Sequence, residues 1–326
     1  MAQGEGMEIS VVVPTFNRKN TVRRCLETLF AQSLDASRFE IIVVVDGSTD
    51  GTAEALNALR PSCRFRVVEQ ENRGLAGARN SGYCAAETGL VLFLDDDMLC
   101  DQNLLARHLQ AHHGVERSIA FGALFLSDDS PPGLAAECFH REIGAFHLGQ
   151  KRNLGLTWQL TDCVFSNASL SRDLLAEVGG FDEGFRMRED LELAVRLLGM
   201  GIPSQYLADA IAYQYYDKCA ADLIRDAEAF ALADAKFARK HPGVRIAGQV
   251  TWLKTEAGWR QKLRRMAALY PPVADWMLAP LCNAAELFIH VPAIRDAGVR
   301  ALQMRRRIHW LHKLIELGAL DSESLR

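Results

Sequence analysis

The chain has 326 residues, of which 49% are hydrophobic and 24% charged, and its formal net charge is −4. This length suffices for one large domain with an appendage or for two modest domains, and the composition excludes a disordered or fibrous protein. The net charge argues against a nucleic-acid partner, because duplex binding depends on a dense positive surface.

The charge is unevenly distributed along the chain. From Lys254 onward, 12 Lys and Arg stand against 7 Asp and Glu, a balance of +5, whereas the preceding residues have 25 against 34, a balance of −9. The acidic part could use a cation in its chemistry. The basic part could face a phosphate group or an anionic membrane surface.

Cysteine spacing and hydropathy favour a cytoplasmic protein. The eight cysteines form no C-x-x-C pair and no zinc-like cluster with histidine, which predicts reduced and mostly buried thiols. Residues 1–8 contain no apolar leader segment, and no uncharged apolar stretch reaches the ~20 residues that a membrane span needs. We therefore expect no membrane span, while peripheral contact at the inner face of the cell membrane stays open for the basic C-terminal part.

The first 125 residues alternate apolar runs of strand length with stretches of helical spacing. The predicted strands are Ile9–Val13, Glu40–Val45, Arg64–Glu69, Leu90–Leu94 and Ile119–Phe125. The predicted helices are Thr21–Ser33, Thr52–Leu59, Leu75–Glu87 and Asn103–His112. This alternation predicts an α/β fold with a mostly parallel sheet covered by helices on both faces, and ligands beyond the carboxyl ends of its strands.

The later residues are less regular and become helical towards the C-terminus. Residues 127–160 predict irregular structure with one short helix. Two further strands are predicted at Asp162–Leu170 and Ser204–Tyr216. The predicted helices are Leu174–Val178, Glu189–Leu198, Asp222–Lys240, Trp259–Leu269 and Ala297–Leu317.

Three consecutive carboxylates, Asp95, Asp96 and Asp97, directly follow the fourth predicted strand. They repel one another in a partly desolvated cleft, and a hard cation such as Mg²⁺ or Mn²⁺ would offset that repulsion. If the segment stays extended, Asp95 and Asp97 point to one face and Asp96 to the other. Taken alone, three such residues are more often a solvated acidic turn.

Polar motifs also follow the other predicted strands. The segment Pro14–Arg18 follows the first strand, and Asp46 opens a turn-forming D-G-S-T-D-G sequence after the second. Gly74–Gly82 follows the third strand but lacks the spacing of a dinucleotide fingerprint and of a P-loop. Asp190 begins a predicted helix, where the helix dipole favours an ionised carboxylate suited to a general base. Taken alone, each of these motifs more often has a structural role.

In their order and spacing, these motifs resemble glycosyltransferase family 2. The resemblance extends from Ile9 to Tyr216 and rests on PTFNR at 14–18, DGSTD at 46–50, NRG at 72–74, ARN at 78–80, DDD at 95–97, NASL at 167–170, GGFD at 179–182 and ED at 189–190. It implies a GT-A fold and an inverting transfer of sugar from a nucleoside diphosphate donor, with UDP as the expected nucleotide.

The resemblance also implies a role for each matching residue. Asp190 is implied as the base that takes the proton from the acceptor hydroxyl. Asp97, together with Asp95, is implied as a ligand of Mn²⁺ or Mg²⁺. The residues implied to hold the donor nucleotide are Pro14, Thr15, Asn17, Arg18, Asp46, Arg79, Asp95 and Asp96.

The same resemblance divides the chain. It implies a catalytic domain at 1–217, with a nucleotide-sugar half at about 8–125 and an acceptor half at about 126–217, followed by a helical region at 218–326. We expect a saccharide or lipid-linked acceptor and a place in bacterial-type surface polysaccharide or glycoconjugate synthesis. The C-terminal helices are expected either to contact a membrane or to pack on the catalytic domain or on a second subunit of a homo-oligomer.

The chain departs from the family pattern in two places. Many members carry a further metal-ligating histidine in or after the last strand, whereas residues 212–216 offer none, so Gln214 or Tyr213 could line the site instead. The processive Q-x-x-R-W signature is also missing, since Gln261–Arg265 lacks the tryptophan, which favours a single addition. Two alternatives stay open, a nucleotidyltransferase and a sugar-nucleotide-binding module without catalysis.

Overall fold

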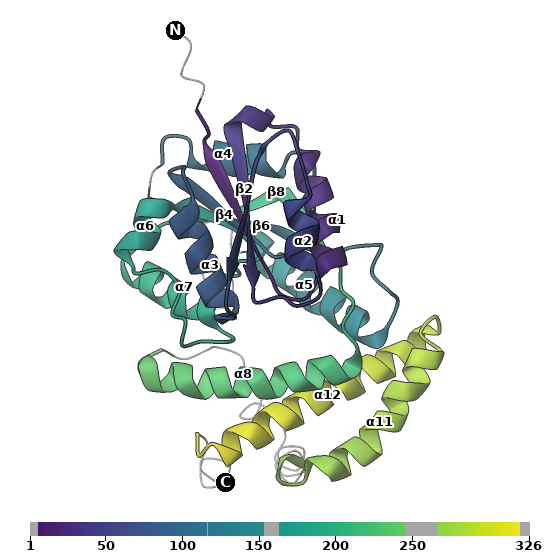
Figure 1. Ribbon diagram of the computed structural model, residues 1–326. Coiled ribbons are helices and arrows are strands. Elements are labelled where there is room, and N and C mark those ends of the chain that lie inside the picture. The colour runs from purple at the N-terminus through teal and green to yellow at the C-terminus, as the bar shows by residue number, and fades with distance from the viewer. Residues whose placement is uncertain (1–5, 116, 153–162, 245–266, 320–326) are drawn as a thin grey trace. The chain divides into compact units, whose positions relative to one another are not determined.

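A computed structural model describes residues 6–115, 117–152, 163–244 and 267–319. The described strands form one eight-stranded sheet in the order β3-β2-β1-β4-β7-β6-β8-β5 (Figure 1). The strands are β1 (Ile9–Thr15), β2 (Phe39–Asp46), β3 (Arg64–Gln70), β4 (Leu90–Leu94), β5 (Met98–Cys100), β6 (Ile119–Leu126), β7 (Asn167–Ser171) and β8 (Ser204–Gln214).

Helices cover both faces of this sheet and make up the C-terminal part. The α-helices are α1 (Lys19–Phe30), α2 (Thr52–Asn57), α3 (Gly74–Ala85), α4 (Leu104–His112), α5 (Leu134–Arg152), α6 (Arg172–Glu177), α7 (Glu189–Gly199), α8 (Ala220–Lys240), α11 (Pro271–Leu287) and α12 (Pro292–Glu316). A single 3₁₀ turn, η1 (Ala36–Arg38), precedes β2 among the described residues.

The strand directions bring several strand ends to one edge. Strands β3, β2, β1 and β4 are mutually parallel, and β7 pairs antiparallel with both β4 and β6. Strand β6 is parallel to β8. Strands β1, β2, β4, β6 and β8 therefore all end at the same edge, which is where an open α/β sheet binds ligands.

Two apolar layers hold the helices on the sheet. One packs α1, α2 and α4 against alternate side chains of the strands, such as Val11 and Leu92. The other packs α3, α6 and α7 against the opposite side chains, such as Val12 and Phe93. Continuous buried strands of this kind are what a helix-covered parallel sheet requires. At Gly82 a Cβ would come within 2.2 Å of Val12, so α3 needs glycine there to approach β1 closely.

The chain divides into two compact units. The first comprises Met1–Asp129 and Ile143–Tyr215 and contains the sheet, and the second comprises Ser130–Glu142 and Tyr216–Arg326. Within the second unit, Trp310 of α12 donates a 2.8 Å hydrogen bond to Asp234 of α8. The outward side of α11 leaves apolar residues exposed, among them Trp276 at 80%. None of the described helices is both long and apolar enough to cross a bilayer.

The predicted α/β fold with a C-terminal helical region is confirmed. Four local features differ from the predictions. Residues 134–152 form a 19-residue helix where irregular structure and one short helix were expected, and neither β5 nor α11 was foreseen. The Asp95–Asp97 segment is also a turn, not an extended strand. The predicted helix Trp259–Leu269 lies largely outside the described residues. The segment Gln261–Arg265 lies wholly outside them. Membrane contact and oligomerisation stay predictions.

Candidate active site

The turn after β1 is tied to the turn after β2. Pro14 and Thr15 are the last residues of β1, and the next turn places Asn17 at a φ of 52°, a left-handed conformation that is uncommon outside glycine. The Asn17 backbone N–H donates to Ser48 Oγ at 2.9 Å, and Asn17 Oδ1 accepts the Thr49 N–H at 2.7 Å. Such backbone strain is maintained only where surrounding contacts hold it, and here both turns form one rigid unit.

Asp46, at the end of β2, holds the loop that follows β3. Its carboxylate accepts hydrogen bonds from Gln70 Nε2 at 2.7 Å, from the Arg73 N–H at 2.8 Å and from the Gly74 N–H at 2.8 Å. The last two N–H groups lie at the start of α3, where the helix dipole favours a negative charge. Asp46 therefore caps α3 and fixes the third strand-end loop.

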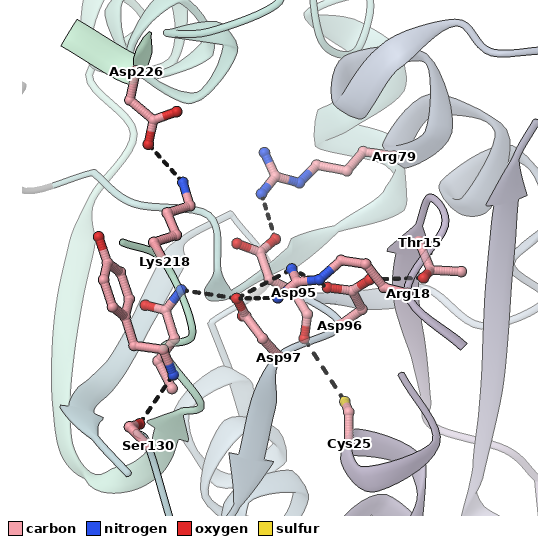
Figure 2. Close-up of polar contacts among 12 residues, drawn as sticks. Thr15, Arg18, Cys25, Arg79, Asp95, Asp96, Asp97, Ser130, Lys218 and Asp226 are labelled. Atoms are coloured by element: carbon pink, nitrogen blue, oxygen red, sulfur yellow. Dashed lines mark hydrogen bonds and ion pairs between the residues drawn. The ribbon is translucent and has the colours of Figure 1, made fainter. Parts of the chain in front are cut away.

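The three acidic residues after β4 form a turn in which the Met98 N–H donates to the Asp95 carbonyl at 3.3 Å. This turn directs the Asp96 carboxylate back to the end of β1. There Thr15 Oγ1 donates to Asp96 Oδ2 at 2.7 Å and Arg18 Nη1 donates to Oδ1 at 2.8 Å (Figure 2). Because both of its oxygens have protein partners, Asp96 serves to join β1 and β4 at the edge.

Asp97 is held differently from Asp96. Its Oδ2 accepts Arg18 at 3.3 Å and Gln214 Nε2 at 3.1 Å. The Tyr215 N–H donates to the Asp97 carbonyl at 2.7 Å, so the end of β8 is fixed against the same turn. The buried Oδ1 of Asp97 has no hydrogen-bond partner in the described part of the chain.

Burial makes this cluster of negative charges unfavourable. Desolvation raises the pKa of Asp96 to about 7, and it also raises the pKa of Asp97, while the Arg18 guanidinium lowers both. A buried carboxylate with an unused oxygen and an upward-shifted pKa is one that a cation would stabilise. In this respect Asp97 fits a divalent metal ion.

The number of protein ligands is small. Within the described ranges, no three His, Cys, Asp or Glu side chains lie together as a metal-binding group. Mg²⁺ characteristically uses one or two carboxylates and takes its remaining ligands from substrate phosphates and water. The residues present therefore fit a cation that binds together with a diphosphate better than one held by the protein alone.

A second charge cluster surrounds Arg79 on α3. Only 2% of this side chain is exposed, and its guanidinium pairs with Asp95 through Nη2 and with Glu189 through Nη1, each at 2.9 Å. Figure 2 shows Asp95 turned away from Arg18 and towards Arg79. Arg79 thus joins α3, the acidic turn and the start of α7. A side chain buried in this way has little surface left for the nucleobase contact expected from the sequence.

Asp190 lies in the first turn of α7, beside Glu189. Arg188, just before the helix, has a φ of 68°, which is strained for a residue with a side chain. Burial raises the pKa of Asp190, and nearby Arg79 opposes that rise. Burial and the charge of Asp190 raise the pKa of Glu189 to about 7. Glu189 pairs with Arg79, whereas Asp190 accepts a hydrogen bond from its own helix, from the Leu191 N–H at 2.7 Å.

Another matching motif has a structural role. Asn167 of β7 donates to the carbonyls of Ala123 and Ala210, so its Oδ1 faces His108 Nε2 at 2.9 Å. His108 Nδ1 lies 2.7 Å from Ser169 Oγ. The amide orientation makes Nε2 a donor, and burial lowers the pKa of His108 to about 4, so near pH 7 the ring is neutral and Nδ1 is an acceptor. His108 fastens α4 to the sheet.

The predicted site residues thus form connected groups at one edge of the sheet. Thr15 and Arg18 meet Asp96 and Asp97, while Arg79 meets Asp95 next to Asp190. Asp46 and Asn17 instead bind neighbouring loops. Sequence reasoning missed Glu189 as the partner of Arg79. The adjacent acidic pair was the available signal, but nothing in it shows which carboxylate faces a buried arginine.

Comparisons with known proteins agree with this geometry. The chain matches the family described as Glycosyl transferase family 2 over residues 10–179, more than half of its length. It is 28% identical over 279 residues to a Validoxylamine A glucosyltransferase of Streptomyces hygroscopicus subsp. jinggangensis, a match that covers 77% of this chain and 64% of that relative. The matched region therefore spans less than two thirds of the relative's own length.

Two solved structures share the fold. A mannosyltransferase of Pyrobaculum calidifontis, in complex with GDP-Man and Mn²⁺, aligns with a TM-score of 0.60 at 20% identity and covers 93% of this chain and 86% of its own. The S. aureus protein TarS 1-349, in complex with UDP, aligns with a TM-score of 0.53 at 18% identity over 96% and 92% of the two chains. At these identities the likeness establishes the fold.

Proposed function

Because this chain belongs to glycosyltransferase family 2 and has the GT-A fold, we propose that it transfers a single sugar, with inversion, from a nucleoside diphosphate sugar to an acceptor hydroxyl. One observation carries the proposal. The acidic turn after β4 connects the Arg18 cluster, at the β1 side, with the Arg79 cluster, which includes the start of α7. This arrangement supports a donor site on one side of the short acidic segment and a general base on the other.

The nucleotide is proposed to bind over the first three strand ends, in the half at about residues 8–125. Asn17 keeps the first two turns together, and Asp46 keeps the third loop in place. These contacts pre-form the site, so fewer backbone dihedrals must be ordered when the nucleotide binds. Two proteins of the same fold, one in complex with GDP-Man and one with UDP, support a diphosphate donor, and UDP stays the nucleotide we propose.

Asp97 and Asp95 are the residues proposed to hold a divalent cation. Such a cation neutralises the charge that develops on the leaving diphosphate. The unpartnered Oδ1 of Asp97 supports its role as the firmer ligand, because Asp95 already pairs with Arg79. Arg18 pairs with Asp97 and with the neighbouring Asp96, and so reduces the repulsion between these two carboxylates in the turn.

Asp190 is proposed as the base that accepts the proton of the attacking hydroxyl. Burial raises its pKa, which makes the carboxylate a stronger base, while Arg79 favours the ionised form that the reaction needs. The start of α7 and the Arg79–Glu189 pair keep this side chain in position. Attack from the side opposite the leaving group inverts the anomeric carbon.

The wider role is proposed from the family resemblance alone. We propose a saccharide or lipid-linked acceptor and a place in surface polysaccharide or glycoconjugate synthesis. No nucleic-acid partner is proposed, in line with the net charge of −4.

A donor panel tests the proposed function. UDP- and GDP-linked sugars are each mixed with the protein and Mn²⁺, and both thermal stabilisation and release of nucleoside diphosphate are measured. We expect one donor to stabilise the protein and to be hydrolysed slowly without acceptor. Asp97→Asn should weaken the Mn²⁺-dependent part of the stabilisation, whereas Asp209→Asn, an exposed control, should not. Donor binding with no release under any condition would instead indicate a binding module without catalysis.

A further inference from the structure

The Arg18 side chain joins two neighbouring carboxylates of the acidic turn, and it holds them unequally (Figure 2). Its Nη1 lies 2.8 Å from Asp96 Oδ1, within the usual range of a charge-assisted hydrogen bond. Its two terminal nitrogens each lie 3.3 Å from Asp97 Oδ2, which is longer than that range. The pair with Asp97 is therefore the weaker one, and it is the one that another cation can replace.

The backbone of Arg18 is fixed, while its side chain is partly open to solvent. Arg18 is the N-cap residue of α1, and its carbonyl accepts the Val22 N–H at 2.9 Å. The preceding residue, Asn17, is held by the turn after β2. The Arg18 side chain is nevertheless 33% exposed, whereas that of Arg79 is 2% exposed. Of these two arginines, Arg18 is thus the one that can exchange partners with a bound ligand.

Arg18 and a divalent cation would use the same carboxylate. Asp97 presents its Oδ2 to Arg18 and to Gln214, and its Oδ1 is the oxygen proposed to meet the cation. A cation on one oxygen of a carboxylate lies close to a guanidinium on the other, and the two positive charges repel each other. This repulsion is stronger in a partly buried site than in water. In this position, Arg18 therefore lowers the affinity of Asp97 for a cation.

A diphosphate offers Arg18 another partner at the same edge of the sheet. A guanidinium binds phosphate oxygens through two parallel N–H···O bonds, which makes arginine a preferred ligand for phosphates. The nucleotide is proposed to bind over the ends of β1, β2 and β3, and Arg18 lies in the turn after β1. The nitrogens that contact Asp97 can turn to a phosphate while Asp96 keeps the guanidinium nearby. Asp97 is then left to the cation, which also binds the diphosphate.

We propose that Arg18 couples the two ligands, because it competes with the divalent cation for Asp97 and turns to the diphosphate of the donor when the nucleotide binds. The cation and the nucleotide then strengthen each other's binding, by the same factor in either order. The cation alone binds weakly, because it must share Asp97 with the guanidinium. This inference rests on the proposed function, and it adds a coupling role for one residue of the donor site.

The test measures binding to the full chain and needs no turnover. The affinity for Mn²⁺ is measured from the electron paramagnetic resonance signal of free Mn²⁺. The affinity for UDP is measured by calorimetry with EDTA and with saturating Mn²⁺, at about pH 8, where protonation of carboxylates interferes least. UMP, which lacks the second phosphate, is the matched ligand control. The variants are Arg18→Met, Arg18→Gln, which keeps a hydrogen-bond donor for Asp96, and Arg23→Met, which removes an exposed arginine of α1.

In the wild type, Mn²⁺ should raise the affinity for UDP about tenfold or more, and the affinity for UMP much less. Arg18→Met and Arg18→Gln should each bind Mn²⁺ alone about tenfold more tightly than the wild type does, and their affinity for UDP should gain correspondingly less from Mn²⁺. Arg23→Met should behave as the wild type. The association of Mn²⁺ with UDP in solution is the same for every protein, so it cancels in the comparison.

Three results would overturn the coupling through Arg18. One is a pair of folded Arg18 variants that bind Mn²⁺ no more tightly than the wild type, or whose affinity for UDP gains as much from Mn²⁺. Another, which needs no variant, is an equal effect of Mn²⁺ on UDP and UMP binding to the wild type. The third is UDP binding that is independent of Mn²⁺ in a wild type that still releases nucleoside diphosphate from a donor, which would leave the sugar transfer standing. A wild type that neither binds UDP nor releases nucleoside diphosphate from any donor would overturn the proposed function as well.

Discussion

At the scale of single residues, the side chain that connects the site is Arg79. It is one guanidinium with 2% exposure among three carboxylates, of which Asp95 and Glu189 are direct partners and Asp190 lies close enough to feel its charge. Removing a buried cation leaves its partners uncompensated, and this is far more costly than removing an exposed pair. We propose that Arg79 positions the donor-side carboxylate and the base rather than binding the nucleotide.

Arg79→Met should therefore lower the free energy of unfolding by about 3–5 kcal/mol at neutral pH. The remaining carboxylates would then have folded-state pKa values raised above their unfolded values, as burial already does for Glu189 at about 7. Such groups bind more protons in the folded state, so the variant should lose stability as the pH rises from 5.5 to 7.5. Urea unfolding of the variant and the wild type at both pH values measures this loss of stability.

Arg73→Met is the matched control. Arg73 also pairs with a glutamate, Glu183 at 2.5 Å, but its side chain is 48% exposed. Solvent screening limits such a pair to less than about 1 kcal/mol. Equal losses of unfolding free energy for Arg79→Met and Arg73→Met would show that Arg79 contributes no more than an exposed ion pair does.

At the scale of elements, the attachment of α4 to β7 depends on a neutral histidine. Burial lowers the pKa of His108 from 6.5 to about 4. Between those values the unfolded chain binds a proton that the folded chain does not, so the free energy of unfolding falls as the pH drops through this window. The shift corresponds to about 3 kcal/mol.

His108→Gln should abolish this contribution. Compared with the wild type, the variant should be less stable at pH 7.5, because the Asn167 and Ser169 contacts are disturbed, but its stability should fall less between pH 6.5 and 4.5. His113→Gln, at an exposed position after α4, should leave the wild-type pH dependence intact. Parallel pH profiles for the wild type and His108→Gln would contradict this account.

The elements also show how far the sequence could be interpreted. Strands β1, β2, β4 and β6 were predictable because buried parallel strands are continuous apolar runs between helical patterns. Strand β5 was not, since three residues carry no periodicity. Helix α11 was missed because Pro280 lies inside it and its outward residues are as apolar as its buried ones. Periodicity detects a difference in hydropathy between the two sides of a helix, and α11 shows little such difference.

The candidate site could likewise be predicted only in part from the sequence. The residue types after each strand were visible in the sequence, because the carboxyl ends of the strands are where an α/β sheet binds its ligand. Which carboxylate pairs with which arginine was not visible in the sequence. The turn at Asp96 separates Asp95 from Asp97, so each carboxylate meets a different arginine, and only the packed structure reveals this.

At the scale of the whole molecule, the second unit has its own core between α8 and α12. Trp310 is buried there and donates to Asp234, whereas Trp276 on α11 is 80% exposed. Trp310→Phe should lower the free energy of unfolding by about 1–3 kcal/mol, because it leaves the buried Asp234 without that partner. Trp276→Phe should change it by less than about 0.5 kcal/mol. Urea unfolding of both variants measures the difference. A larger loss of unfolding free energy for Trp276→Phe than for Trp310→Phe would contradict this account, because it would mean that the outward side of α11 is packed.

The central claim is that Asp190 is the base of a glycosyl transfer whose donor is held by a separate set of residues. The most direct measurement combines donor binding with turnover in Asp190→Asn, using the donor found in the nucleotide-sugar panel. General-base catalysis typically contributes ~10²–10⁴-fold in rate. The account predicts unchanged thermal stabilisation by donor and Mn²⁺ together with a loss of acceptor-dependent turnover of that size. An Asp190→Asn protein that transfers sugar at a near-wild-type rate would contradict it.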